Sequence, residues 1–175
     1  MATDRRLAID EARVDLACFE VDGQVYALDV AQVREVVRCQ EVTPLPKAPA
    51  LIEGVIDLRG TIVPVLDLGR ALGRAPVPGD DPRARIAIIA ADGLVLGLRV
   101  AAAIDVLPVA ASALEDPPEL ATQSGYDAVS AVVRRSGAGG APVLVLSLDH
   151  ILECVHRSSV AGAADVAATA SGGRA

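Results

Sequence analysis

An internal repeat constrains the fold of this chain more than any other feature of its sequence. Residues 22–37 align with residues 92–107 at an offset of 70, with seven identities in 16 positions. Residues 63–72 align with residues 143–152 at an offset of 80. Chance similarity is the alternative, because strands rich in Val and Leu match one another easily. If the repeat is real, the chain contains two copies of one small unit.

Each copy opens with the pattern of a β-hairpin. Asp22-Gly23 and Asp92-Gly93 both lie between apolar alternations. This dipeptide tolerates the positive φ angles that a two-residue hairpin turn requires. The apolar residues are mainly Val, Leu, Ile and Ala, which favours β-rich packing. The two copies therefore predict two small antiparallel β-barrels.

Later in each copy, a strongly apolar run leads into a helical turn. Residues 63–68 and 143–148 have the pattern of buried central strands. Asp67 and Asp149 are expected to cap the short helices that follow, because a carboxylate accepts hydrogen bonds from the free N–H groups of a helix start. Pro64 is expected at a strand edge or a bulge, since it has no N–H to donate.

A third hairpin pattern lies in the stretch 54–68, Gly-Val-Ile-Asp-Leu-Arg-Gly-Thr-Ile-Val-Pro-Val-Leu-Asp-Leu. Arg59 and Gly60 interrupt two apolar runs, as in a tight turn, and Gly60 supplies freedom at positive φ. Such a turn holds the Arg59 side chain out to solvent.

The composition changes along the chain and predicts its domain organisation. One folded domain is expected over residues 15–157, with barrel-like halves at roughly 15–73 and 86–157. The Pro- and Gly-containing segment between the halves is typical of a loop. Residues 1–14 are expected to form a flexible arm, and residues 158–175, mainly Ala, Gly and Ser, a disordered tail.

Charge and composition exclude several classes of function. With a net charge of −7, the chain lacks the clustered cations that nucleic-acid binding requires. Cys18, Cys39 and Cys154 are widely spaced without C-x-x-C, which is typical of reduced thiols in a cytoplasmic protein. No segment has about 20 uncharged apolar residues, so no membrane span is expected, and the charged N-terminus does not have the pattern of a signal peptide.

Patterns typical of enzyme active sites are absent from the sequence. His150 and His156 are the only histidines, and their spacing of six does not match a zinc site. The sequence has no G-x-S-x-G, P-loop or G-x-G-x-x-G motif. We therefore expect no enzyme activity, no catalytic residue and no metal site.

Three groups of residues resemble the CheW family, the coupling proteins of bacterial chemosensory arrays. They are Val30-x-x-Val33-x-Glu35-Val36-Val37, then Thr43-x-Leu45-Pro46 with Pro49, and then Gly54-Val-x-x-Leu58-Arg59-Gly60-x-x-Val63-Pro64-Val-x-Asp67-Leu68. Their order and spacing match over about 50 residues, and the weaker second copy extends the resemblance to roughly 140 residues.

The resemblance implies a fold and a role. The fold is mainly β, with two small five-stranded β-barrel subdomains packed on a shared core and short helices, including one near the C-terminus. The role is that of a non-enzymatic adaptor that couples chemoreceptors to a CheA-type histidine kinase in a chemosensory signalling array. The implied partners are the regulatory domain of the kinase and the cytoplasmic tip of methyl-accepting chemoreceptors, without cofactor, nucleic acid or direct membrane insertion. The implied location is cytoplasmic, peripheral to membrane receptor arrays.

The resemblance also implies a binding site. An apolar patch with a few charged anchors suits a helical hairpin at a receptor tip, because apolar contact supplies affinity and charge sets register. Simpler interpretations stay open: Arg59 as a solvated loop residue, Glu35 as a carboxylate paired with Arg34 or Arg38, and the glycines as requirements of turn geometry. Carried over residue by residue, the receptor- and kinase-binding positions fall on Val33, Glu35, Val36, Gly54, Arg59, Gly60 and Gly97.

Two positions depart from the family's pattern. Asp57 stands where Asn usually precedes Leu-Arg-Gly, and Ala101 stands where the family often has Asp. The second copy has Arg134-Arg135 and a Gly-rich loop in place of Leu-Arg-Gly, which favours a site in the first copy. The departures bear on the choice of receptor and kinase. Two other functions stay open, namely a scaffold of CheW fold in another signalling complex without receptor binding, and a small-ligand barrel or unrecognised enzyme.

Overall fold

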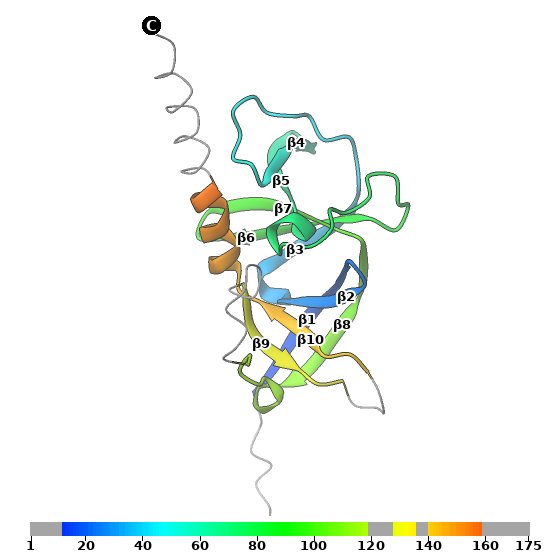
Figure 1. Ribbon diagram of the computed structural model, residues 1–175, viewed down its shortest axis with the longest axis vertical. Helices are drawn as coiled ribbons and strands as arrows, with labels where there is room; N and C mark the ends of the chain where they lie inside the picture. The colour runs from blue at the N-terminus through cyan, green and yellow to red at the C-terminus, as the bar shows by residue number, and fades with distance from the viewer. Residues whose placement is uncertain (1–11, 119–127, 136–139, 159–175) are drawn as a thin grey trace, which may run out of the picture.

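The computed structural model describes residues 12–118, 128–135 and 140–158, which form two β-sheets and a few short helices (Figure 1). The strands are β1 (Arg13–Val21), β2 (Gln24–Asp29), β3 (Val33–Arg38), β4 (Ile52–Leu58), β5 (Thr61–Asp67), β6 (Arg85–Ala91), β7 (Leu94–Val100), β8 (Ala102–Ala110), β9 (Val129–Val133) and β10 (Val143–Leu146). The helices are η1 (Val30–Gln32), α1 (Leu68–Ala71), η2 (Ala111–Ala113) and a C-terminal helix that begins at residue 148 and is described to residue 158.

Each sheet takes strands from both halves of the chain. Sheet A has the order β8-β1-β2-β10-β9, and sheet B has the order β3-β6-β7-β5-β4. The prediction of two five-stranded units is confirmed, but the assignment of one unit to residues 15–73 and the other to residues 86–157 is wrong. Only Ala101 separates β7 from β8, which is too short for a hairpin turn. The chain therefore passes from sheet B into sheet A there, and η1 carries it from sheet A into sheet B between β2 and β3.

The strand register agrees with both alignments of the repeat. Val65 of β5 pairs in parallel with Gly97 of β7, and Val145 of β10 pairs in parallel with Ala27 of β2. Val65 and Val145 are 80 residues apart, and Ala27 and Gly97 are 70 apart, as in the two aligned runs. Equivalent residues of the two copies thus occupy equivalent places in the two sheets.

The predicted hairpin turns are confirmed at the backbone. Asp22 and Asp92 both have φ of 49°, and the glycines after them have φ of 73° and 80°. Positive φ at both central residues is the geometry of the two-residue turn that matches the twist of paired strands. The turn between β4 and β5 is of the same kind, with φ of 52° at Arg59 and 85° at Gly60.

The expectation for Pro64 is wrong in one respect. Pro64 lies in β5, which is inside sheet B between β4 and β7 rather than at its edge. Its partner in β4 is Val55, whose N–H and C=O are both bonded to Thr43 and so point away from β5. The pairing of β5 with β7 starts only at Val65. The missing N–H of Pro64 therefore costs no ladder hydrogen bond.

Helix capping follows the prediction in the first copy and departs from it in the second. Asp67 is the N-cap of α1, and its Oδ1 accepts a hydrogen bond from the N–H of Arg70 at 3.1 Å. Asp149 is wrong as a cap, because it lies inside the helix that starts at residue 148. The preceding Ser147 instead accepts a hydrogen bond through its Oγ from the N–H of His150 at 3.5 Å. Ser147 is the residue aligned with Asp67 at the offset of 80.

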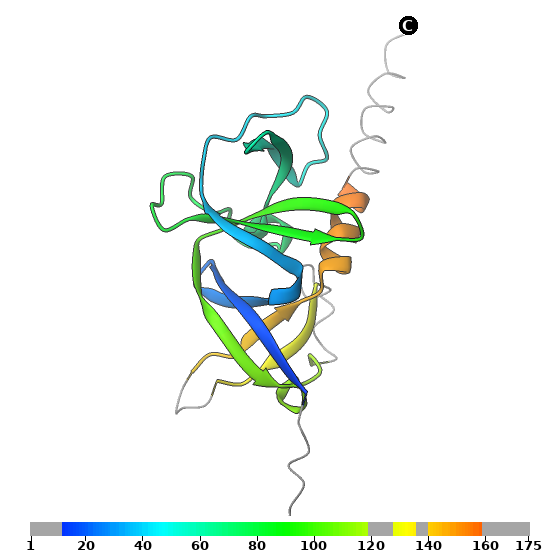
Figure 2. The same cartoon turned by 180° about the vertical axis from the view of Figure 1, so that it is seen from behind.

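One apolar core is shared by the two sheets, as expected. It contains Phe19 and Leu28 of sheet A, Leu66 and Leu98 of sheet B, and Ile151 of the C-terminal helix, each at most 1% exposed. Burial of one such side chain contributes about 1.5–3 kcal/mol. In both views the C-terminal helix lies against the hairpin end of β6 and β7 (Figures 1 and 2). The helix therefore covers one end of this shared core.

In the part of the chain that the structure describes, the two outer strands of each sheet are connected by one isolated β-bridge. In sheet B, Thr43 follows β3 and forms an isolated bridge to Val55 of β4, with N–O distances of 2.8 and 2.9 Å. In sheet A, Glu115 forms the corresponding bridge to Val132 of β9. None of the helices in the described ranges is long and apolar enough to cross a membrane.

Candidate functional site

The turn between β4 and β5 is held in place by its own residues. Asp57 accepts a hydrogen bond through Oδ1 from the N–H of Gly60 at 2.7 Å. Arg59 occupies the left-handed region, which costs a residue with a Cβ about 1–2 kcal/mol, so this hydrogen bond helps to keep the turn in a strained conformation. An Asn side chain could accept the same bond, so the departure at position 57 preserves the turn and adds a negative charge beside Arg59.

Arg59 and Glu35 form an ion pair that joins the two edges of sheet B. Arg59 Nη2 contacts Glu35 Oε1, although Glu35 lies in β3 and Arg59 follows β4 at the opposite end of the strand order. The Arg59 side chain is 74% exposed and that of Glu35 is 34% exposed. The alternative pairing of Glu35 with Arg34 or Arg38 is wrong. A pair this exposed adds at most about 1 kcal/mol to stability, so it positions the arginine more than it stabilises the fold.

A bulge in β3 brings Val33 and Val36 to the same face of the strand. Val33 pairs with Ile89, Glu35 with Ile88 and Val36 with Ala87, so the register shifts between Val33 and Glu35. Val33 is half-buried against the shared core, whereas Val36 is 40% exposed. The two predicted valines therefore form one apolar strip that starts at the core and ends in solvent, while Glu35 points from the opposite face of β3 toward Arg59.

The three predicted glycines have different surroundings. Gly54 is buried with φ of 156°, and a Cβ there would lie 2.1 Å from the carbonyl oxygen of Thr43. Gly97 is also buried, and its Cβ would lie 2.8 Å from Cγ2 of Ile86. Only Gly60 has open space around it. The chain's own packing explains Gly54 and Gly97, and the turn explains Gly60, so among the glycines only Gly60 lies on the surface with Arg59.

A partly buried ionic network supports the base of the β4–β5 hairpin. Arg99 Nη2 lies 3.1 Å from Glu53 Oε1 and donates to the carbonyl of Val77 at 3.2 Å. Asp67, which is fully buried, accepts from the N–H of Val77 at 2.9 Å. Burial raises the pKa of the Glu53 carboxyl, and the Arg99 guanidinium opposes that rise. The sequence motifs do not predict this network, although an arginine inside the apolar run of β7 indicates an oppositely charged partner.

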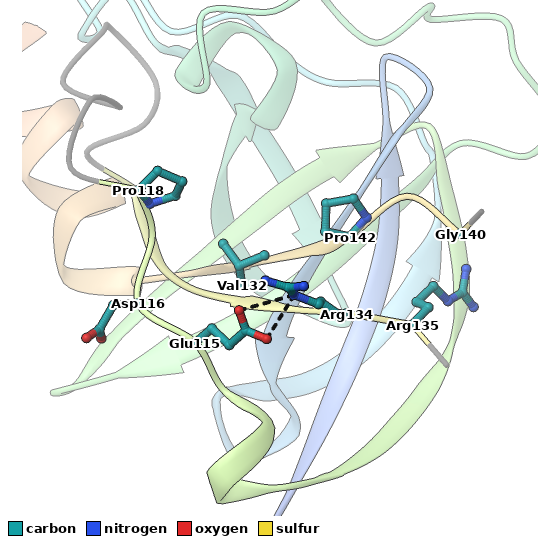
Figure 3. A pocket seen from close by; sticks show the side chains of 8 residues that line it. All are labelled: Glu115, Asp116, Pro118, Val132, Arg134, Arg135, Gly140 and Pro142. Carbon is teal, nitrogen blue, oxygen red and sulfur yellow. Dashed lines mark hydrogen bonds and ion pairs between the residues drawn. The ribbon is translucent and has the colours of Figure 1, made fainter. Parts of the chain in front are cut away.

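Sheet A has an ion pair of its own at a different place. Arg134 Nε lies 3.0 Å from Glu115 Oε1, beside a hollow of about 500 Å³ that is also lined by Arg135 and Pro142 (Figure 3). The repeat counterpart of Glu35 is Asp105, which instead accepts from the N–H of Val106. The arrangement of Glu35 and Arg59 is therefore not repeated at the equivalent positions of sheet A.

Exposed residues around the turn extend the surface beyond the predicted set. Arg34 and Arg38 are exposed on β3 on either side of Val36. Ile62, opposite Asp57 at the start of β5, is 62% exposed. Arg34 and Arg38 could have been found from the sequence, because each lies two residues from Val36 on the same strand. The sequence does not show, however, which residues of an edge strand face solvent.

The described residues contain no group of three His, Cys, Asp or Glu side chains that could hold a metal ion. Cys18, Cys39 and Cys154 are free thiols. Burial raises the pKa of the Cys18 and Cys39 thiols above the usual value for cysteine, which keeps both in the unreactive protonated form. What this surface offers is an apolar strip, an oriented ion pair and a rigid turn, which suits binding to another macromolecule.

Comparison with known proteins gives a consistent result. Residues 15–155 match the family model described as CheW-like domain. The protein FrzA of Myxococcus xanthus is 32% identical over 173 residues, which cover 92% of this chain and 99% of FrzA. The chemotaxis protein CheW of Treponema pallidum is 29% identical over 132 residues, 74% of this chain and 78% of that protein. The crystal structure of the scaffolding protein TtCheW from Thermoanaerobacter tengcongensis superposes with a TM-score of 0.72 at 30% identity, covering 81% of this chain and 94% of that chain.

Proposed function

Because this chain belongs to the CheW-like domain family, we propose that it is a non-enzymatic adaptor that couples chemoreceptors to a CheA-type histidine kinase in a chemosensory signalling array. Two of the reported relatives are named as a chemotaxis protein and a scaffolding protein. The partners would be the regulatory domain of the kinase and the cytoplasmic tip of methyl-accepting chemoreceptors. The adaptor would then lie in the cytoplasm beside the membrane receptors.

The observation that carries this proposal is the grouping of three predicted features around β3, where the Glu35–Arg59 pair links the two edges of sheet B. Val36 is exposed on β3, Glu35 precedes it on the same strand, and the ion pair to Glu35 holds the Arg59 turn against that strand. An apolar contact surrounded by oriented charges is typical of the centre of a protein interface, where apolar burial supplies affinity and the charges set the register.

The fixed conformation of the Arg59 turn would favour binding to a partner. Glu35 contacts the Arg59 side chain and Asp57 fixes the backbone of its turn, so this arginine loses less conformational freedom on binding than a mobile loop arginine would. The partner then has to displace or extend an existing ion pair, which favours partners with a matching acceptor. This selectivity requires no chemistry from the chain, in agreement with an adaptor.

Co-sedimentation tests the proposal directly. The chain is mixed with the kinase and with membranes that carry the chemoreceptor, both taken from the same genome, and each pair is also tested alone. We expect the chain to pellet with the receptor membranes and to bring the kinase with it. Binding to the kinase without binding to the receptor would favour a scaffold in another signalling complex, and binding to neither would overturn the proposal.

A further inference from the structure

The exposed side of β3 carries two arginines that flank the exposed valine. Arg34, Val36 and Arg38 are the three exposed residues of this strand, and Glu35 and Val37 between them are half-buried. At a rise of about 3.3 Å per residue, the backbone positions of Arg34 and Arg38 are roughly 13 Å apart. Because these three side chains are exposed, a partner can contact this side of β3 without displacing another strand.

These arginines have no carboxylate within 4 Å among the residues that the structure describes. By contrast, Arg59 pairs with Glu35, Arg99 with Glu53, and Arg134 with Glu115. A chain with a net charge of −7 offers many carboxylates, so two unpaired arginines on one short strand are a local excess of positive charge.

The next strand adds to this excess instead of neutralising it. Arg38 lies directly opposite Arg85 of β6 in the antiparallel register. The Arg85 guanidinium donates to the carbonyls of Pro82 and Ala84 at 2.9 and 2.8 Å. Among the described residues it has no carboxylate within 4 Å, and the charge of Asp81 acts on it only from a longer distance. Like charges that face each other across two strands destabilise the pair. A bound anionic group between Arg38 and Arg85 would remove this repulsion.

We propose that the β3 face binds an acidic partner segment in which two carboxylates, roughly 13 Å apart, flank an apolar side chain. The apolar side chain packs on Val36, and the carboxylates pair with Arg34 and with the Arg38–Arg85 pair. This proposal rests on the proposed adaptor function, because it defines the chemistry of the partner surface that docks beside Arg59. Complementary charge of this kind accelerates association and fixes register, and salt screens it.

The first test compares two variants with the same change in net charge. Arg34→Gln/Arg38→Gln removes the two cations of β3, and Arg13→Gln/Arg157→Gln removes two exposed cations elsewhere. Dissociation constants for the receptor cytoplasmic fragment and for the kinase regulatory domain are measured between 50 and 300 mM NaCl. For at least one partner, we expect about tenfold weaker binding at low salt and a shallower salt dependence for the β3 variant only. Equal behaviour of the two variants toward both partners, while the wild-type chain binds, would overturn the charge proposal and leave the adaptor function intact.

A second test does not depend on the proposed partners. The wild-type chain is titrated with the peptide acetyl-Glu-Ala-Val-Ala-Glu-amide and with its Gln counterpart, and backbone amide shifts are followed by NMR. We expect shifts that cluster on β3 and the facing residues of β6 with the Glu peptide and are much smaller with the Gln peptide. Shifts that are absent or scattered over the surface would contradict the proposal, even if the chain binds neither receptor nor kinase.

Discussion

Arg59 is an unusual residue because it is at once exposed, strained and held. Its φ of 52° is unfavourable for an arginine, its side chain is 74% exposed, and its guanidinium contacts Glu35. The neighbouring Asp57 bonds to the turn rather than to the arginine. Asp57, Glu35 and Arg59 together carry one net negative charge at the turn. An Asn at position 57, the residue that the family resemblance leads us to expect, would make this sum zero.

Replacement of Arg59 by Ala is expected to weaken association with the receptor or the kinase by about 1 kcal/mol or more. The melting temperature should change little, because a surface ion pair contributes at most about 1 kcal/mol to stability. Titration calorimetry with each partner measures the first effect, and thermal unfolding measures the second. Arg134→Ala, which removes an exposed ion pair from sheet A, is the matched control. Affinities equal to wild type for both partners would show that Arg59 is only a solvated turn residue.

Gly97 is a residue whose role the structure assigns to packing. Its φ is not in the left-handed region, but a methyl group would lie 2.8 Å from Cγ2 of the fully buried Ile86. Gly97→Ala is therefore expected to destabilise the protein by about 1–3 kcal/mol through overpacking, as measured by chemical denaturation. Gly79→Ala, at an open position, should stay within about 0.5 kcal/mol of wild type. If Gly97→Ala left stability unchanged but abolished partner binding, Gly97 would be a contact residue instead.

The strand β3 serves two purposes along its length. Its bulge lets Val33 pack on the shared core while Val36, three residues later, points into solvent on the same face. Its inner side carries Glu35 toward the Arg59 turn. An edge strand with an exposed apolar residue risks unwanted pairing, and flanking arginines are a known protection against it. The same arginines can select an acidic partner.

Val36→Asp should therefore disrupt binding without unfolding the chain. Val36 is 40% exposed, so a carboxylate at this position remains hydrated, but it removes the apolar contact and places a negative charge between Arg34 and Arg38. Circular dichroism should match wild type, and affinity for the receptor fragment should fall at least tenfold. Val106→Asp makes the same change at the repeat counterpart on β8, which is 51% exposed. A collapsed fold for Val36→Asp would show that Val36 is internal, and equal binding losses in the two variants would show that the site is not confined to the first copy.

In the part of the chain that the structure describes, each sheet is completed by a hairpin from the other half. We therefore expect the two sheets to fold as a single cooperative unit. Sheet A needs β1 and β2 beside β8, β9 and β10, and sheet B needs β6 and β7 beside β3, β4 and β5. Neither half can complete a five-stranded sheet or bury its face of the shared core alone. The proposed binding surface on sheet B therefore depends on residues from both halves.

A fragment experiment tests this dependence. Residues 12–73 and 74–158, produced separately, are each expected to lack the far-ultraviolet circular dichroism of the full chain at micromolar concentration. Mixed in equal amounts, they should regain it, because the exchanged hairpins then find their partner strands. A half that folds cooperatively as a monomer would contradict the exchange of strands seen in the sheets.

The parts of the fold that depend on local sequence could be predicted, and the parts that depend on long-range pairing could not. The Asp-Gly turns, the Arg59-Gly60 turn and the Asp67 cap follow from backbone preferences of a few residues. The pattern of a hairpin does not reveal which sheet it joins, so the exchange between halves was missed. Likewise, Glu35 and Arg59 were both predicted as site residues, but their ion pair depends on how the edges of sheet B approach each other. The roles of Gly54 and Gly97 required the positions of Thr43 and Ile86.

The most direct test of the adaptor role is receptor-controlled kinase activity in a reconstituted mixture. Kinase and receptor-containing membranes are held at fixed concentration, and autophosphorylation is measured with and without this chain, before and after addition of a receptor ligand. We expect kinase activity to respond to the ligand only when the chain is present, and to respond less with Arg59→Ala than with Arg134→Ala. Kinase activity that is the same with and without the chain, under conditions where the chain is folded, would contradict the account.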